Sequence, residues 1–174
     1  GNLASCCMSI GSAWGSTVYV PEVGCFLNNA MQNFDPRPGL PNSIAPGKMP
    51  IFAAPAIVAA RRGKPVFAGS GSGGYRIETG VLHTFLNMID HKMRLQAAVD
   101  HPRVHCQGRE TVVDHRIPAN VRKRMAKAGH QIQTAAEAPA AWPFGRVCAV
   151  AWDARRKLLT GGAGPSWNTG IAGL

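Results

Sequence analysis

The sequence predicts an α+β fold or a layered α/β/β/α architecture. Apolar and β-branched segments of strand length come first, segments with helical periodicity occupy the middle, and further strand-like segments come last. The chain has 174 residues, of which 45% are hydrophobic and 16% charged, a balance typical of a packed domain rather than a disordered chain. This length favours a single domain or part of one. No segment reaches the ~18 continuous apolar residues of a membrane span.

The first third of the chain is expected to contain short strands and a long loop. Residues 3–10 and 17–20 have the composition of strands and are separated by a turn rich in Gly and Ser, and residues 25–27 form a third short strand. Residues 33–50 carry five prolines and two glycines, which exclude a helix or a central strand. We expect an ordered loop or a lid there.

The remaining elements follow from turns and from a change of period. Residues 57–60 and 65–68 predict a hairpin that leads into the Gly-rich run 69–74. From Arg76 onward, apolar residues recur at helical spacing. The later elements are expected to be helices at 76–91, 95–99 and 118–128 and strands at 131–133, 146–152 and 157–159.

The charge of the chain is unevenly distributed. The net charge is +10, and the whole excess lies in residues 61–174. Such a field favours an anionic partner, which includes nucleic acid, a membrane surface, an acidic substrate and an acidic subunit. The basic residues and the tryptophans are spread over several elements rather than gathered on one surface, so we expect no nucleic-acid partner.

Five cysteines are present without a C-x-x-C pair. We interpret them as reduced, mostly buried thiols, which favours a reducing compartment. Cys6 and Cys7 are neighbours in an extended segment and should therefore point to opposite faces.

The Gly-rich run 69–74 satisfies the pattern G-x-G-x-x-G. A dinucleotide site would need an acidic residue ~20 positions later, at the end of a second strand, but Asp90 lies at the end of the helix that the glycines open. Consecutive Gly N–H groups at a helix N-terminus can instead hold an anion or a developing oxyanion. A tight strand-to-helix turn without chemistry is the alternative.

Two further groups of side chains could carry chemistry. His101 and His105 lie close to Cys106, but Pro102 prevents the imidazoles from sharing one continuous helix, so we expect a structural role and predict neither a metal nor a cofactor. Ser9, Cys6 and Cys7 are possible nucleophiles, although no G-x-S-x-G elbow marks any of them.

Three segments carry a resemblance to a known family: residues 24–48 with their Phe-Asp-Pro-Arg-Pro-Gly-x-Pro-Asn-Ser loop, residues 73–77 (Gly-Gly-Tyr-Arg-Ile), and residues 97–105 (Ala-Ala-Val-Asp-His-Pro-Arg-Val-His). From Gly1 to about Asp153 the chain resembles the small subunit of the gamma-glutamyltranspeptidase (glutathione hydrolase) family, and its loop looks more like the broad bacterial acyltransferase-like branch. The resemblance implies the N-terminal nucleophile hydrolase fold, a four-layer α/β/β/α sandwich. The chain would be its small-subunit half, a single-domain fragment spanning residues 1–174 that the large subunit of the same precursor completes.

The resemblance also implies a mechanism. The precursor of such enzymes cleaves itself, and the new N-terminal Thr of the small subunit attacks an amide to form an acyl-enzyme, which water or an amine resolves. In the family this Thr lies about ten residues before the turn that matches Gly1-Asn2, and it is missing from this chain, so the fragment alone is expected to be inactive.

The resemblance assigns roles to individual positions. It implies that Gly73 and Gly74 supply the oxyanion N–H groups and that Ser9 supplies the hydroxyl that orients the nucleophile. The substrate-binding positions of the family, where it has Asn, Gln or Glu, Asp and a Ser-Ser pair, fall on Gly11, Ala30, Asn33 and Phe52-Ala53. These replacements remove a charge and several hydrogen-bonding groups, so we expect a small amide or acyl substrate other than glutathione.

Two alternatives stay open at this point. The loss of glutamate-binding residues also fits a non-catalytic relative that serves as a binding or structural module. Relatives are often exported, whereas the unpaired cysteines favour a reducing compartment, so cytoplasmic and periplasmic locations are both compatible with the sequence.

Overall fold

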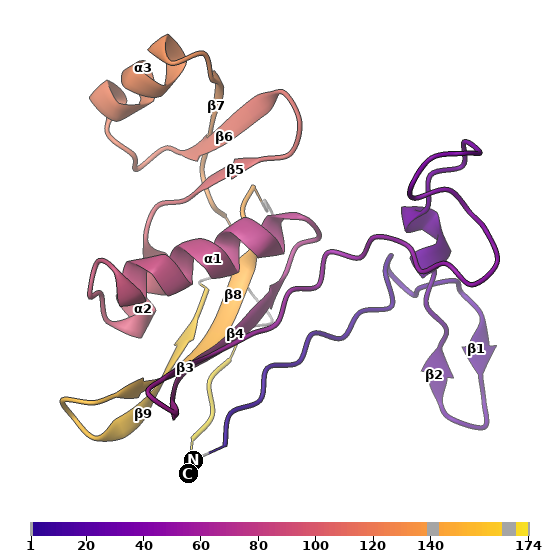
Figure 1. The fold of residues 1–174 in the computed structure, drawn as a ribbon, viewed down its shortest axis with the longest axis horizontal. Coiled ribbons are helices and arrows are strands. Elements are labelled where there is room, and N and C mark those ends of the chain that lie inside the picture. Colours follow the sequence, from indigo (N-terminus) through magenta and orange to yellow (C-terminus); the bar gives the residue numbers. More distant parts are fainter. Residues whose placement is uncertain (1, 139–142, 165–169, 174) are drawn as a thin grey trace. The chain divides into compact units, whose positions relative to one another are not determined.

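The computed structural model describes residues 2–138, 143–164 and 170–173, and the chain divides into two compact units (Figure 1). Unit 1 comprises Gly1–Cys7 and Ala54–Leu174, and unit 2 comprises Met8–Ala53. Helices and several sheets are both present, which confirms the α+β class.

A four-stranded antiparallel sheet forms the centre of unit 1. Its strands are, in spatial order, β3 (Ile57–Arg61), β4 (Lys64–Ser72), β8 (Arg146–Asp153) and β9 (Leu158–Ala163). The predicted hairpin is confirmed as β3 and β4, but β4 continues into the Gly-rich run as far as Ser72. The close pairing of β4 with β8 requires glycine at position 71, because a Cβ there would lie 2.1 Å from the carbonyl oxygen of Arg146.

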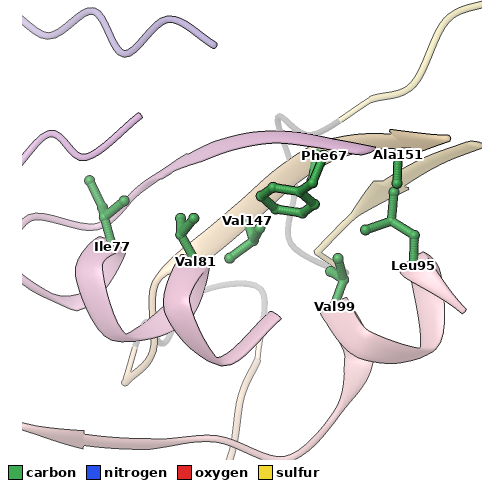
Figure 2. Packing of buried hydrophobic residues seen from close by; sticks show 8 residues of the cluster. Phe67, Ile77, Val81, Leu95, Val99, Val147 and Ala151 are labelled. Atoms are coloured by element: carbon green, nitrogen blue, oxygen red, sulfur yellow. The ribbon is translucent and has the colours of Figure 1, made fainter. Parts of the chain in front are cut away.

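Helices α1 (Arg76–Ile89) and α2 (Leu95–Asp100) cover one face of this sheet (Figure 1). Figure 2 shows the side chains from both helices pointing at those of β4 and β8. The buried cluster consists of Phe67, Ile77, Val81, Leu95, Val99, Val147, Ala149 and Ala151. Each large side chain buried there contributes about 1.5–3 kcal/mol, so this interface holds the start of α1 firmly against the sheet.

A second sheet lies beside α1 within unit 1 and contains β5 (Val104–Cys106), β6 (Glu110–Asp114) and β7 (Gln131–Ala135). Strands β6 and β7 are parallel, and α3 (Ala119–Lys127) makes the crossover between them. The sequence predicted α3 and β7 but not β5 and β6. Strands β5 and β6 have three and five residues, which is too short for a clear period to show in the sequence.

Unit 2 is mostly loop, as its prolines predicted. It contains a short hairpin of β1 (Tyr19–Val20) and β2 (Cys25–Phe26), followed by a 3₁₀ helix, η1 (Ala30–Asn33). The Phe26 ring packs between Trp14 and Tyr19, with ring centroids 5.3 and 5.2 Å away.

The predicted strand at residues 3–10 is not present as a strand. In unit 1, side chains rather than backbone groups tie this segment to β4: the Ser5 hydroxyl donates to the Gly69 carbonyl at 2.8 Å, and the Cys7 thiol donates to the Gly71 carbonyl at 3.6 Å. Because side chains make these contacts, the backbone ladder that defines a strand does not form.

All five cysteines are unpaired, but the expectation that they are mostly buried is wrong. Cys6, Cys25 and Cys106 are exposed, and Cys7 and Cys148 are half-buried. Cys6 lies outside any strand, Cys25 is in a two-residue strand and Cys106 is in the edge strand β5, so little structure covers these three thiols. Cys6 and Cys7 do differ in exposure, as neighbours in an extended segment should. Among the described helices, none has the length and apolar character needed to cross a membrane.

Candidate functional site

The turn between β4 and α1 places two glycines ahead of the helix. Gly73 has a φ of 129° and Gly74 a φ of 63°, both in the region that favours glycine. The Gly74 carbonyl accepts a hydrogen bond of 3.0 Å from the N–H of Ile77, which begins the helical pattern. Among the described residues, no hydrogen bond is donated by the N–H of Gly73 or of Gly74.

These two N–H groups lie at the N-terminus of a helix of 14 residues. The positive end of a helix and backbone N–H donors together stabilise negative charge, whether it belongs to a bound anion or develops on a carbonyl oxygen during acyl transfer. A Cβ at Gly74 would meet nothing within 4 Å, so this turn has open space beside it. The arrangement can hold an oxyanion.

The opposite side of the turn is tightly packed against Gly145. A Cβ at Gly73 would lie 3.3 Å from the Cα of Gly145, and a Cβ at Gly145 would lie 2.3 Å from the carbonyl oxygen of Arg76. Backbone therefore meets backbone at the start of α1. Sequence reasoning missed Gly145, although its place directly before the predicted strand 146–152 was a usable signal.

The two histidines of the His-Pro-Arg-Val-His run have separate neighbours. The Nδ1 of His105 lies 2.9 Å from the hydroxyl of Thr79 on α1, whereas the Nδ1 of His101 lies 3.2 Å from the carbonyl of Pro102. The part of the chain that the structure describes contains no group of three or more side chains arranged to hold a metal ion. His105 is buried beside α1, whereas His101 is exposed and contacts only its own segment.

In unit 2, Ser9 and Gly11 are adjacent. The N–H of Gly11 donates to the Ser9 hydroxyl at 3.0 Å, and Ser9 is exposed. Gly11 has a φ of 89°, and a Cβ there would lie 2.0 Å from the Oδ1 of Asn29. The local backbone is thus built around the absence of a side chain at position 11.

Asn29, which sequence reasoning also missed, organises this part of unit 2. Its Oδ1 accepts the N–H of Ser12 at 2.9 Å, and its Nδ2 donates to the Ser12 hydroxyl at 2.8 Å and to the Oε1 of Gln32 at 3.1 Å. This network holds the segment containing Ser9 and Gly11 beside η1, which begins at Ala30. The Asn-Asn pair of the sequence was the signal for it.

Asn42 links the end of η1 to the segment that leads to Phe52. Its Nδ2 donates to the carbonyl of Asn33 at 2.7 Å, and its Oδ1 accepts the N–H of Ile51 at 3.1 Å. Phe52 is exposed and Ala53 is half-buried. The structure therefore connects Asn33 to the neighbourhood of Phe52 and Ala53, whereas Gly73 and Gly74 belong to unit 1.

The proline-rich loop of unit 2 is held by its own polar residues. The Arg37 guanidinium pairs with the Asp35 carboxylate at 2.7 Å, and hydrogen bonds from Arg37 lower the pKa of Asp35 to about 2. Ser43 is buried, where it accepts the N–H of Leu40 at 2.7 Å and donates to the carbonyl of Arg37. These contacts fit an ordered loop, one of the two forms (an ordered loop or a lid) expected for residues 33–50.

Comparison with known proteins finds matches to this chain in sequence and in structure. The sequence model of the family described as gamma-glutamyltranspeptidase matches residues 1–174. An acylase ACY 1 proenzyme from Pseudomonas sp. strain V22 is 37% identical over 132 residues, which are 76% of this chain and 24% of the relative. A glutathione hydrolase proenzyme from Bacillus subtilis strain 168 is 29% identical over 175 residues, which are 100% of this chain and 29% of the relative.

Solved structures show the same relationship. An acivicin-inhibited gamma-glutamyltranspeptidase aligns with a TM-score of 0.82 and 29% identity, covering 97% of this chain and 95% of that chain. A mutant of the Helicobacter pylori gamma-glutamyltranspeptidase aligns with a TM-score of 0.79 and 29% identity, covering 95% of this chain and 94% of that chain. The chain spans 24–29% of the length of the two curated relatives.

Proposed function

Because the chain belongs to the gamma-glutamyltranspeptidase family, within the N-terminal nucleophile hydrolases, we propose that it is the small-subunit half of an amidohydrolase or acyltransferase. Its substrate in this proposal is a small amide other than glutathione. The observation that carries the proposal is the pair of Gly73 and Gly74 N–H groups, which donate to nothing among the described residues and lie at the N-terminus of α1.

The proposed chemistry uses a Thr in the part of the precursor that precedes Gly1. Its hydroxyl attacks the amide carbon while its own α-amino group takes the proton, and the negative carbonyl oxygen accepts hydrogen bonds from Gly73 and Gly74. The amine then leaves with that proton, and water or an acceptor amine releases the acyl group from the enzyme. The Ser9 hydroxyl orients the nucleophile in this scheme.

The substrate assignment rests on three positions of unit 2. Gly11 and Ala30 provide no side-chain donor or acceptor, and Asn33 is neutral where the family has a carboxylate. A substrate ammonium group would be desolvated there without an opposite charge, which weakens binding. An acyl group without an α-amino group avoids this cost. This chain is similar to a protein named acylase, which supports such a substrate.

The partner in this proposal is the large-subunit part of the same precursor. The sheet face opposite α1 and α2 is apolar: Val58 is 53% exposed and Val150 39%, and both flank Ala68 in register. Trp152 and its cross-strand neighbour Leu159, which is 63% exposed, continue the same face. The second sheet of an α/β/β/α sandwich would cover these side chains. Residues 1–174 would then be a fragment of a single domain that the large subunit completes.

The test is to express the complete precursor and determine the intact mass and N-terminal sequence of its products. A small subunit that opens with Thr supports maturation. Activity is then compared on two anilides that differ only in the α-amino group, γ-glutamyl anilide and glutaryl anilide. Faster turnover of the glutaryl compound supports the proposal, and family-like γ-glutamyl turnover overturns the substrate assignment. A single uncleaved, inactive chain supports the non-catalytic relative instead.

A further inference from the structure

We infer that Arg103 is a positioning residue for the oxyanion turn: by holding the carbonyl of Gly145, it sets the place of Gly73 and Gly74. This inference rests on the proposed function for its catalytic consequence. The geometry itself concerns unit 1 alone.

Arg103 is the largest fully buried side chain among the described residues, with 1% of its surface exposed. Its Nη1 donates to the carbonyl oxygen of Gly145, and its Nη2 donates to both carboxylate oxygens of Glu137, at 3.1 and 3.2 Å. Burial lowers the pKa of Arg103, and the charge of Glu137 opposes that effect. A cation so deeply buried is retained at a desolvation cost, which points to a role beyond stability.

Gly145 transmits the position of Arg103 to the start of α1. Its Cα faces Gly73, where a Cβ would be 3.3 Å away, and a Cβ on Gly145 itself would lie 2.9 Å from the Cα of Ile77. Its carbonyl oxygen would be 3.1 Å from a Cβ at Gly80, one turn farther along α1. With backbone packed against backbone, Gly145 cannot shift without displacing the turn that precedes the helix.

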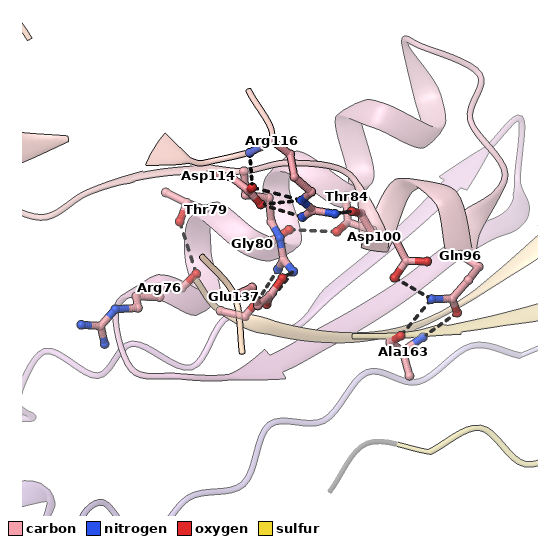
Figure 3. Close-up of polar contacts among 12 residues, drawn as sticks. Arg76, Thr79, Gly80, Thr84, Gln96, Asp100, Asp114, Arg116, Glu137 and Ala163 are labelled. Carbon is pink, nitrogen blue, oxygen red and sulfur yellow. Dashed lines mark hydrogen bonds and ion pairs between the residues drawn. The ribbon is translucent and has the colours of Figure 1, made fainter. Parts of the chain in front are cut away.

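The backbone of Arg103 is hydrogen-bonded to Asp114, which belongs to a second pair of charges. The carbonyl of Arg103 accepts the N–H of Asp114 at 3.0 Å, and Asp114 is fully buried. The Arg116 guanidinium pairs with Asp114 at 2.6 Å and donates to the carbonyl of Asp100 at 2.8 Å (Figure 3). This network anchors Arg103 to β6 and to the end of α2, so its side chain reaches Gly145 from a rigid base.

A shift of the turn is expected to act on the transition state more than on substrate binding. Oxyanion donors are useful only at the position that the charged oxygen occupies, so a displacement of ~1 Å costs rate rather than affinity. A residue that serves stability alone would not separate kcat from KM in this way.

The experiment uses the complete precursor with Arg103→Lys, which keeps the charge but has no fork to reach Gly145 and Glu137 together. Glu137→Gln is the second variant, because it removes the opposite charge and leaves the Arg103 side chain in place if Arg103→Lys fails to fold. Arg122→Lys is the matched control: Arg122 donates to the carbonyl of Ile117 at 3.0 Å and to Thr134 at 3.0 Å, in the same unit but on α3.

Two measurements are made on each variant: kcat and KM for the better of the two anilides, and hydrogen–deuterium exchange of peptides spanning residues 70–78. We expect about a tenfold or larger fall in kcat, with KM within about twofold, and faster exchange at 70–78 for Arg103→Lys and Glu137→Gln but not for Arg122→Lys. Exchange and kcat unchanged in both variants, or changed equally in the control, would overturn the inference. If the wild-type precursor is inactive on both anilides but Arg103→Lys and Glu137→Gln still exchange faster than the wild type at 70–78, the positioning role is supported and the proposed function is refuted.

Discussion

Gly11 and Asn29 are in mutual contact across unit 2, so that a Cβ added to Gly11 would lie 2.0 Å from the Asn29 Oδ1. Asn29 cannot simply swing aside, because its amide binds the backbone N–H and the hydroxyl of Ser12. The left-handed φ of 89° at Gly11 adds a backbone penalty to this overlap. The local structure thus requires glycine at position 11, to which the resemblance assigns a substrate-binding Asn of the family.

Gly11→Asn is therefore expected to destabilise unit 2 instead of restoring γ-glutamyl binding. We expect a loss of about 2 kcal/mol or more, from the overlap and the backbone strain together. The measurement is chemical denaturation of the precursor, with hydrogen exchange over residues 9–33. Gly24→Asn is the control, since Gly24 has a φ of 65° and a Cβ there meets nothing within 4 Å. Equal stability of the two variants would refute the argument.

Gly74→Ala is expected to lower activity by displacing the oxyanion donors. A Cβ at Gly74 has open space, so only its positive φ opposes alanine, at a cost of about 1–2 kcal/mol. Relief of that strain would rotate the N–H group and reduce kcat by about tenfold to a hundredfold. Gly63→Ala has a φ of 73° and equal space at the β3–β4 turn, so it matches the strain without touching the site. Similar kcat values for the two variants would contradict the role of Gly74.

The buried Asp114 carboxylate should make the free energy of unfolding depend on pH in the acid range. Burial opposes its ionisation, but hydrogen bonds and charge from Arg116 outweigh burial and hold the pKa of Asp114 below its ordinary value. Because the unfolded chain binds this proton first, the contribution of Asp114 is complete above pH ~4 and is lost as the pH falls through the lower folded-state pKa. Asp114→Asn should lower the free energy of unfolding at pH 7 and flatten its decline below pH ~4.

The control for this titration is Asp90→Asn, at the exposed C-terminal end of α1. Denaturation midpoints between pH 2 and pH 7, roughly the range spanned by carboxylate titration, provide the measurement. An acid decline that is as steep in Asp114→Asn as in the wild type would show that other carboxylates govern it.

Leu159→Lys tests whether the large subunit packs on the apolar face of the four-stranded sheet. Placing a charge on a side chain that is now 63% exposed should change the fragment's stability little, but should block assembly if a second sheet buries it. We expect the complete precursor to accumulate unprocessed or aggregated, as measured by gel filtration and intact mass. Leu82→Lys, on the outer face of α1 and 47% exposed, is the control. Normal maturation of Leu159→Lys would remove this face from the interface.

Local patterns in the sequence determined much of unit 1. The period of four in residues 77–88 predicted α1, the apolar segments around Arg62-Gly63 predicted the β3–β4 hairpin, and Pro118 with Gly129 marked α3, because each signal depends on residues within one element. The Gly-rich run likewise predicted the strand-to-helix turn between β4 and α1, whereas its role in holding an anion stays a prediction. Ordered motifs, rather than composition, indicated the family.

Only the tertiary structure decided the contacts between distant segments. Strands β5 and β6 form because Val113 and Asp114 are buried against neighbours that no local period reveals, and the exposure of Cys6, Cys25 and Cys106 depends on which edges stay uncovered. The union of Arg103 with Gly145, 42 residues apart, is a further case. Burial and charge pairing are properties of the packed chain, so the sequence alone offered no reason to single out Arg103.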